Sequence, residues 1–217
     1  NGFAGDFQIG ATIGVLLPAW IVLSSLVNLR SKTRNAPSFL SGLRRLTPSY
    51  YGMLLAHIGF AASVLGVAMV TSFNDERDIR MQVGERMESV SGYEVSFDGV
   101  KSITGPNYQG QRGSFTLWQD GDFVAEMHPE KRRYHARSGQ VMTEAAIDAS
   151  LLRDVYIALG EPVGEHAWAV RVHVKPFIRF IWLGAILMAL GALLAICDKR
   201  YRAAMPRNEQ GADDAKA

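Results

Sequence analysis

Three long apolar runs divide the chain into alternating apolar and polar parts. They extend over about residues 7–29, 50–73 and 177–197. Each run is close to the roughly 20 residues that a helix needs to cross the hydrocarbon core of a bilayer. The pattern therefore predicts three transmembrane helices, and we divide the chain into five parts: a helix and basic loop (1–49), a second helix (50–73), a polar domain (74–175), a third helix (176–198) and a tail (199–217).

Within the polar domain, short stretches alternate between apolar and polar residues. They are "DIRMQVG", "YEVSFDGVKSI", "GSFTLWQDGDFVAEM" and "AWAVRVHVKP". Such alternation is typical of half-buried strands, and the dipeptide Asp120-Gly121 favours a tight type I′ hairpin turn. The sequence therefore predicts a membrane α-helical protein with a mainly antiparallel β domain, built as a small sandwich or a partly closed barrel.

The segment "MTEAAIDASLLRDVYIALG" fits two structures. It could be a helix capped by Thr143, with apolar residues at helical spacing over 147–155 and a stop at Gly160. It could equally be two strands broken around Ala149, because its Val-Tyr-Ile stretch suits a sheet. Both interpretations stay open at this point.

The charges are segregated along the chain, although the net charge is only +2. The polar domain has 12 Lys and Arg against 16 Asp and Glu. Two flanking segments are strongly basic: Arg30, Lys32, Arg34, Arg44 and Arg45 in the loop, and Lys199, Arg200 and Arg202 in the tail. Because short basic loops stay in the cytoplasm, residues 74–175 are predicted to lie outside it, in the periplasm if the membrane is a bacterial inner membrane.

Several classes of function have no motif in this sequence. Cys197 is the only cysteine, so no disulfide can form within the chain, and there is no C-x-x-C-H haem-attachment motif. There is also no glycine-rich phosphate loop, no Ser-His-Asp arrangement and no basic aromatic groove for nucleic acid. The chain begins at Asn1 without a signal peptide pattern, so we expect it to be the C-terminal portion of a longer polytopic protein.

The polar domain has one strongly basic segment, "EKRRYHARSG", and further isolated histidines. The basic segment could bind a haem propionate or an acidic partner, or it could be a solvated strand edge where cations discourage further pairing. It contains Lys131, Arg132, Arg133, His135 and Arg137. We expect His128, His166 and His173 to be surface residues, and His173 to face solvent between two core valines.

His57 is the one histidine in an apolar run, where an unpaired ionisable ring is unfavourable by a few kcal/mol. On an ideal helix it points about 140° away from a seam of small residues, which would let another helix approach closely. The seam contains Gly52, Ala56, Gly59, Ser63 and Gly66, and the apolar neighbours of His57 are Met53, Phe60, Ala61, Val64 and Ala68. His57 could be an axial ligand of haem iron, a hydrogen-bonding partner for a neighbouring helix, or part of a proton relay.

Several stretches resemble, in order, the C-terminal part of the CcmF family, the haem lyase subunit of bacterial cytochrome c maturation. They lie between about Arg44 and Arg202 and are "YYGMLLAHIGFAASVLGVA", "ERDIRM", "SITGPNYQG", "EKRRY", "MTEAAID", "RDVYIALGE" and "WAVRVHVKPFIRFIWLGAILMALGALLAICDKRYR". The resemblance implies a multi-pass protein of the bacterial inner membrane, which takes haem from a haem chaperone and attaches it to apocytochrome c through thioether bonds. A thiol-handling subunit of the lyase complex is the third implied protein partner.

The resemblance also implies a haem b in the membrane, which would pass electrons to the substrate haem. Two histidines on different spans hold this haem in the family, and His57 matches the second of them. The first, and the Trp-rich segment that handles substrate haem, belong to an earlier part of the family sequence, so this fragment alone is expected to be inactive. Two alternatives remain, a non-enzymatic haem transport or chaperone subunit and a membrane scaffold whose outer domain binds proteins.

Overall fold

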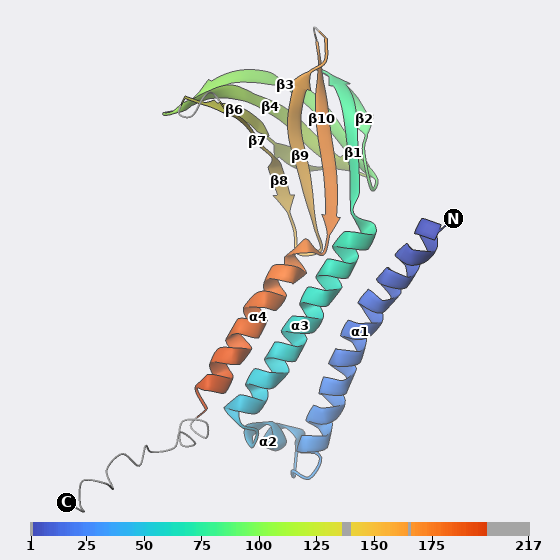
Figure 1. The fold of residues 1–217 in the computed structure, drawn as a ribbon, viewed down its shortest axis with the longest axis vertical. Helices are drawn as coiled ribbons and strands as arrows, with labels where there is room; N and C mark the ends of the chain where they lie inside the picture. The colour runs from blue at the N-terminus through green and yellow to red at the C-terminus, as the bar shows by residue number, and fades with distance from the viewer. Residues whose placement is uncertain (1, 136–139, 165, 199–217) are drawn as a thin grey trace, which may run out of the picture. The chain divides into compact units, whose positions relative to one another are not determined.

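The computed structural model describes residues 2–135, 140–164 and 166–198. Its helices are α1 (Gly2–Thr33), α2 (Phe39–Arg44), α3 (Pro48–Phe73) and α4 (Ile178–Ile196), as Figure 1 shows. Among the described residues, three segments are long and apolar enough to cross a membrane: Ile9–Thr33, Pro48–Phe73 and Ile178–Ile196. These segments agree with the three helices predicted from the apolar runs.

The part of the chain between α3 and α4 is folded into antiparallel strands. They are β1 (Asp75–Gln82), β2 (Arg86–Glu88), β3 (Tyr93–Thr104), β4 (Tyr108–Gln119), β5 (Asp122–Met127), β6 (Glu130–Tyr134), β7 (Val141–Glu144), β8 (Ala146–Ala149), β9 (Arg153–Pro162) and β10 (Ala167–Pro176). One sheet has the order β1-β10-β9-β8 and the other the order β2-β3-β4-β6-β7, with β5 paired to β4.

The core of this domain lies between the two sheets. Phe97 of β3 and Phe115 of β4 are fully buried and paired in register, and their rings stack with centroids 4.7 Å apart. The four-stranded sheet contributes its own buried residues, among them Ile157 of β9 and Val172 of β10. Every second residue of these strands faces the core, which confirms the predicted antiparallel β domain and identifies it as a sandwich.

The turn between β4 and β5 has the predicted conformation. Both central residues have positive φ, 52° at Asp120 and 86° at Gly121. A type I′ turn requires positive φ at both positions, which Asp tolerates and Gly adopts freely. The hairpin predicted at Asp120-Gly121 is therefore confirmed.

The helical interpretation of the segment after Thr143 is wrong, and the strand interpretation is right. The segment continues β7, forms β8 and, after a break that follows Ala149, enters β9. Val155, Ile157 and Leu159 are fully buried. The buried apolar residues therefore recur at every second position, as in a strand, and not at the 3.6-residue spacing of a helix. Pairing with β10 and burial of this row outweigh the helical propensity of the alanines and leucines.

The chain divides into two compact units, one containing the sandwich (66–180) and the other containing helices (12–65 and 181–198). Within the helical unit, α3 and α4 approach each other through glycines. A Cβ added at Gly59 would lie 2.6 Å from the carbonyl oxygen of Gly184, and one at Gly52 would lie 2.5 Å from that of Gly191. The seam of small residues predicted on the second apolar run therefore packs on the third.

Both connections between the sandwich and its flanking helices are made by neighbouring strands. β1 begins two residues after the end of α3, and β10 ends two residues before the start of α4. The two strands pair in antiparallel register, with Asp75 opposite Val174. This end of the four-stranded sheet is therefore the end nearest to the apolar helices along the chain.

Candidate functional site

His57 lies on α3, and its ring is fixed by one hydrogen bond. Its Nδ1–H donates to the carbonyl oxygen of Met53, one helical turn earlier, at 2.8 Å. Because a carbonyl can only accept, this contact places a proton on Nδ1, so the neutral form of the ring has its lone pair on Nε2. The same arrangement orients histidines that ligate metals in many proteins.

The surface around His57 is apolar and partly open. The His57 side chain is exposed, and its neighbours Met53 and Phe60 are 41% and 48% exposed. Ala61, which lies beside His57 on an ideal helix, is only 3% exposed. The exposed apolar surface around His57 is therefore narrower than the ideal helix predicted. What remains is an exposed imidazole flanked by two large apolar side chains.

Among the described residues, the other histidines all belong to the β unit and none to the helical unit. His128, His135 and His166 are exposed residues of the β unit. Among the described residues, no group of three or more His, Cys, Asp and Glu side chains could hold a metal ion. Within the helical unit, His57 is therefore the one histidine among the described residues that could serve as a ligand.

His173 is more buried than predicted. It alternates with the core residues Val172 and Val174, but its side chain is only 19% exposed. Its Nδ1 lies 3.6 Å from a carboxylate oxygen of Glu76, and its ring lies beside that of Tyr156. Burial lowers the pKa of His173, and the charge of Lys175 lowers it further. His173 thus faces away from the core, as predicted for a residue between two core valines, but its side chain is only partly exposed to solvent.

The basic segment is not a strand edge, because β6 lies between β4 and β7. Lys131 pairs with Glu161, and Arg132 donates to Glu130 at 2.7 Å while stacking on Tyr108. Only Arg133 of these three is exposed.

Glu130 shows how the basic segment is used. It is 6% exposed and accepts hydrogen bonds from Arg112 and Arg132. Burial alone would raise the pKa of Glu130, but these hydrogen bonds outweigh burial and hold the pKa below its usual value. Two cations of the cluster, Lys131 and Arg132, thus neutralise carboxylates of the sandwich. Arg137 lies outside the described residues.

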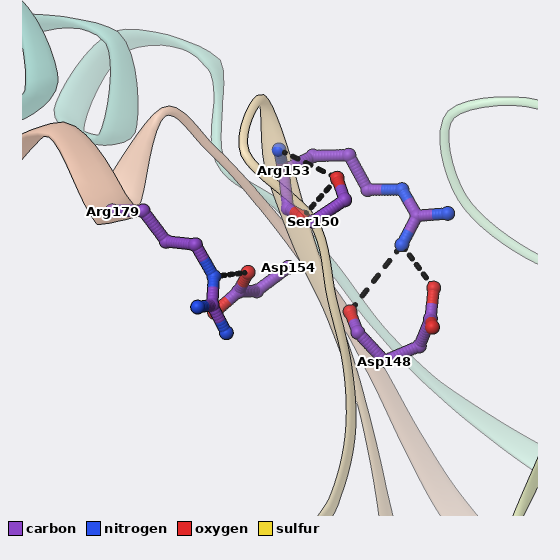
Figure 2. A network of polar contacts seen from close by, with 5 residues as sticks. All are labelled: Asp148, Ser150, Arg153, Asp154 and Arg179. Atoms are coloured by element: carbon purple, nitrogen blue, oxygen red, sulfur yellow. Dashed lines mark hydrogen bonds and ion pairs between the residues drawn. The ribbon is translucent and has the colours of Figure 1, made fainter.

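A polar network at the helix end of the sandwich escaped the sequence analysis (Figure 2). Arg179, in the first turn of α4, donates to Asp154 at 2.9 Å, and Asp154 is only 5% exposed. Beside it, Arg153 pairs with Asp148. The signal was present in the sequence, because an arginine at the start of an apolar span requires a nearby acceptor. What the sequence could not indicate was which carboxylate, 25 residues earlier, would supply it.

Comparison with known proteins gives consistent results. A family profile described as "CcmF C-terminal beta-sandwich" matches residues 72–176. The cytochrome c-type biogenesis protein CcmF of Pseudomonas aeruginosa is 48% identical over 200 residues, which are 92% of this chain and 30% of that protein. CcmF of Escherichia coli is 38% identical over 190 residues, 88% of this chain and 28% of that protein. The chain therefore spans less than a third of the length of these relatives.

A solved structure has the same fold. A protein named cytochrome c heme lyase CcmF aligns with a TM-score of 0.66 over 88% of this chain and 34% of its own, at 16% identity. At 16% identity this similarity shows the fold alone. The family assignment depends on the relatives found by sequence. The sandwich, the three apolar helices and these relatives together lead to one conclusion: the chain belongs to the CcmF family and contains its C-terminal β-sandwich.

Proposed function

We propose that this chain acts in cytochrome c maturation as the C-terminal part of a haem lyase subunit. In this proposal the complete protein attaches haem covalently to apocytochrome c, and His57 is an axial ligand of a haem b held in the membrane. The names of its relatives, cytochrome c-type biogenesis proteins, support the general role. The observation that carries the ligand assignment is the hydrogen bond from Nδ1 of His57 to Met53.

The residues around His57 suit a haem. With the Nδ1 proton donated to Met53, the neutral form of the imidazole has its free lone pair on Nε2, the atom that would bind haem iron. Met53 and Phe60 offer exposed apolar side chains on either side, against which a flat macrocycle could pack. A haem bound here would supply a one-electron carrier, with His57 as one of the residues that hold it.

The glycine contacts between α3 and α4 have a supporting role in this proposal. They hold α3 against its neighbour through backbone contacts, which restricts rotation of the helix about its own axis. A fixed rotation keeps the imidazole on the opposite face of α3. The protein thus orients the ligand at two levels, the ring by Met53 and the helix by α4.

The partners and location follow from the same assignment. We propose that residues 74–175 lie in the periplasm, beyond a bacterial inner membrane, where the haem chaperone, the apocytochrome and a thiol-handling subunit would be met. The basic bias of the loop between α1 and α3 supports this orientation. The mildly acidic sandwich is then the surface available to those proteins.

The decisive experiment is replacement of His57 by alanine in the complete protein. We expect His57→Ala to abolish or strongly perturb the Soret and α bands of the purified protein while it still inserts in the membrane. His173→Ala is the matched control, because His173 lies in the sandwich, and it should leave the spectrum nearly unchanged. If the His57 variant accumulates normally with a wild-type haem spectrum, the ligand assignment is wrong.

Two further measurements separate the alternatives. A purified complete protein without haem absorption would indicate a scaffold rather than a haem protein. Reconstitution with apocytochrome and haem, followed by haem staining after denaturation, separates a lyase from a transporter, because only thioether-linked haem survives denaturation. A haem-containing protein that never yields stained cytochrome would favour the transport or chaperone role.

A further inference from the structure

The turn between β8 and β9 exposes two adjacent leucines. Leu151 is 62% exposed and Leu152 is 56% exposed, in a turn bounded by Ala149 and Arg153. Scattered exposed leucines are common on protein surfaces, so exposure alone carries no meaning. The position of this pair in the fold, however, is unusual.

A hydrogen bond ties the turn to the start of the third apolar helix. The backbone N–H of Phe177 donates to the carbonyl oxygen of Leu152 at 2.7 Å, and Phe177 directly precedes α4. α4 has 19 residues, which at 1.5 Å per residue give a length of about 28 Å. The hydrocarbon core is about 30 Å thick, so α4 has no residues to spare and must begin at the core boundary. Leu152 is therefore at the boundary as well.

The polar groups that hold this turn are paired within the protein. The N–H and the hydroxyl of Ser150 both donate to the carbonyl oxygen of Arg153, at 2.9 and 2.8 Å, and the Arg153 N–H donates back to the Ser150 hydroxyl. The guanidinium of Arg153 pairs with Asp148, and that of Arg179 with Asp154 (Figure 2).

Such pairing is what a segment needs to leave bulk water, since unpaired backbone and charged groups resist transfer into a membrane. The turn presents apolar side chains while its nearby charges are neutralised. Because Leu152 is hydrogen-bonded to Phe177, directly before α4, lipid is the partner that this apolar surface would meet.

We propose that Leu151 and Leu152 insert into the interfacial layer of the bilayer, so that the sandwich contacts lipid directly at the β8–β9 turn. Lipid-facing leucines would then fix the height of the sandwich above the membrane, in addition to its two covalent connections. This proposal does not depend on haem binding or on the lyase reaction, and it fails or holds independently of them.

The experiment uses spin labels on the complete protein. Cys197 is replaced by serine, and a nitroxide label is attached to Leu151→Cys or, in a second variant, to Leu152→Cys. The protein is reconstituted in nanodiscs of phosphatidylethanolamine and phosphatidylglycerol, and collision rates are measured with oxygen, which partitions into lipid, and with the water-soluble complex NiEDDA. Val163→Cys is the matched control, because Val163 is 41% exposed in the turn at the opposite end of β9.

The expected result is a several-fold higher ratio of oxygen to NiEDDA accessibility at 151 and 152 than at 163. A ratio at 151 and 152 equal to that at 163 would mean that the turn lies in water, and the proposal would be wrong. Low accessibility to both reagents would also overturn it, because the leucines would then be covered by protein. Circular dichroism of each labelled variant checks that the sandwich is intact.

Discussion

At the scale of single residues, the most informative groups are buried polar side chains whose partners come from distant parts of the sequence. Asp154 and Glu130 are nearly fully buried carboxylates, and arginines satisfy both. A buried charge is tolerated only when it is paired. Loss of Arg179 or Arg112 should therefore destabilise the fold more than loss of an exposed arginine usually does.

Removal of Arg179 is predicted to destabilise the sandwich. In Arg179→Met, the buried carboxyl group of Asp154 loses its hydrogen-bonding partner, which costs about 1–3 kcal/mol in the free energy of unfolding. The double variant Arg179→Met/Asp154→Asn should lose less, because the unpaired carboxyl group is removed as well. Urea unfolding of the purified protein in detergent, followed by tryptophan fluorescence, measures both. A double variant that is less stable than Arg179→Met would contradict this account.

His173 is predicted to make stability depend on pH. Since its pKa is lowered in the folded protein, the unfolded chain binds the proton more readily. The stability is therefore complete above the unfolded pKa of about 6.5 and declines as the pH falls below it, through the lower folded pKa.

The test compares melting temperatures at about pH 7.5 and about pH 5.5. His173→Gln should reduce the difference between the two, whatever its effect at the higher pH. His128→Gln, at an exposed position, should leave the difference as it is in the unmodified protein. Equal pH dependence in the His173 variant and the unmodified protein would refute the prediction.

At the scale of secondary-structure elements, the contact between α3 and α4 depends on glycine at particular positions. Gly59 and Gly184 face each other, as do Gly52 and Gly191. In a membrane, helices associate through close packing rather than through exclusion of water, so a single methyl group at such a contact separates two backbones.

Gly59→Ala is predicted to weaken this helix pair. Its Cβ would lie 2.6 Å from a backbone oxygen and 2.8 Å from the backbone nitrogen of Met188, neither of which can move as a flexible side chain would. Gly10→Ala is the control, because its Cβ would meet no atom within 4 Å. Thermal denaturation in detergent should show a lower melting temperature for Gly59→Ala alone. Similar melting of both variants would argue against close backbone packing at Gly59.

At the scale of the whole molecule, the predicted topology orders the chain across the membrane. A cysteine at Asp120 should react with an impermeant thiol reagent in intact cells from which the outer membrane barrier has been removed. A cysteine at Arg34, in the basic loop, should react only after the inner membrane is disrupted. Both are introduced with Cys197 replaced by serine. Labelling of position 120 only after disruption would reverse the proposed orientation.

The sequence predicted the helices and most strands because each rests on a local pattern. Apolar length was sufficient for α3 and α4, and alternation was sufficient for β3 and β10. The segment forming β8 and β9 remained ambiguous, because its local pattern fits both periods and only pairing with β10 decides between them.

The candidate site was predictable in part. His57 could be selected because an ionisable residue in an apolar run is rare, and the helical wheel placed it opposite the glycine seam. Which ring nitrogen of His57 is hydrogen-bonded could not be predicted from the sequence, because it depends on the position of the Met53 carbonyl oxygen. The partners of Asp154 and of Glu130 are set by the tertiary fold, which no local pattern records.

The neighbouring positions of β1 and β10 have a consequence for how the membrane part assembles. About a hundred residues separate α3 from α4, and closing a loop of that length opposes helix pairing by about 4 kcal/mol of chain entropy, against about 1 kcal/mol for a four-residue loop. Pairing of Asp75 with Val174 brings the two ends of that loop together. Once the sandwich has folded, the entropy cost of bringing α3 and α4 together is therefore close to that of a short loop. The two helices can then associate as readily as helices joined by a short hairpin connection.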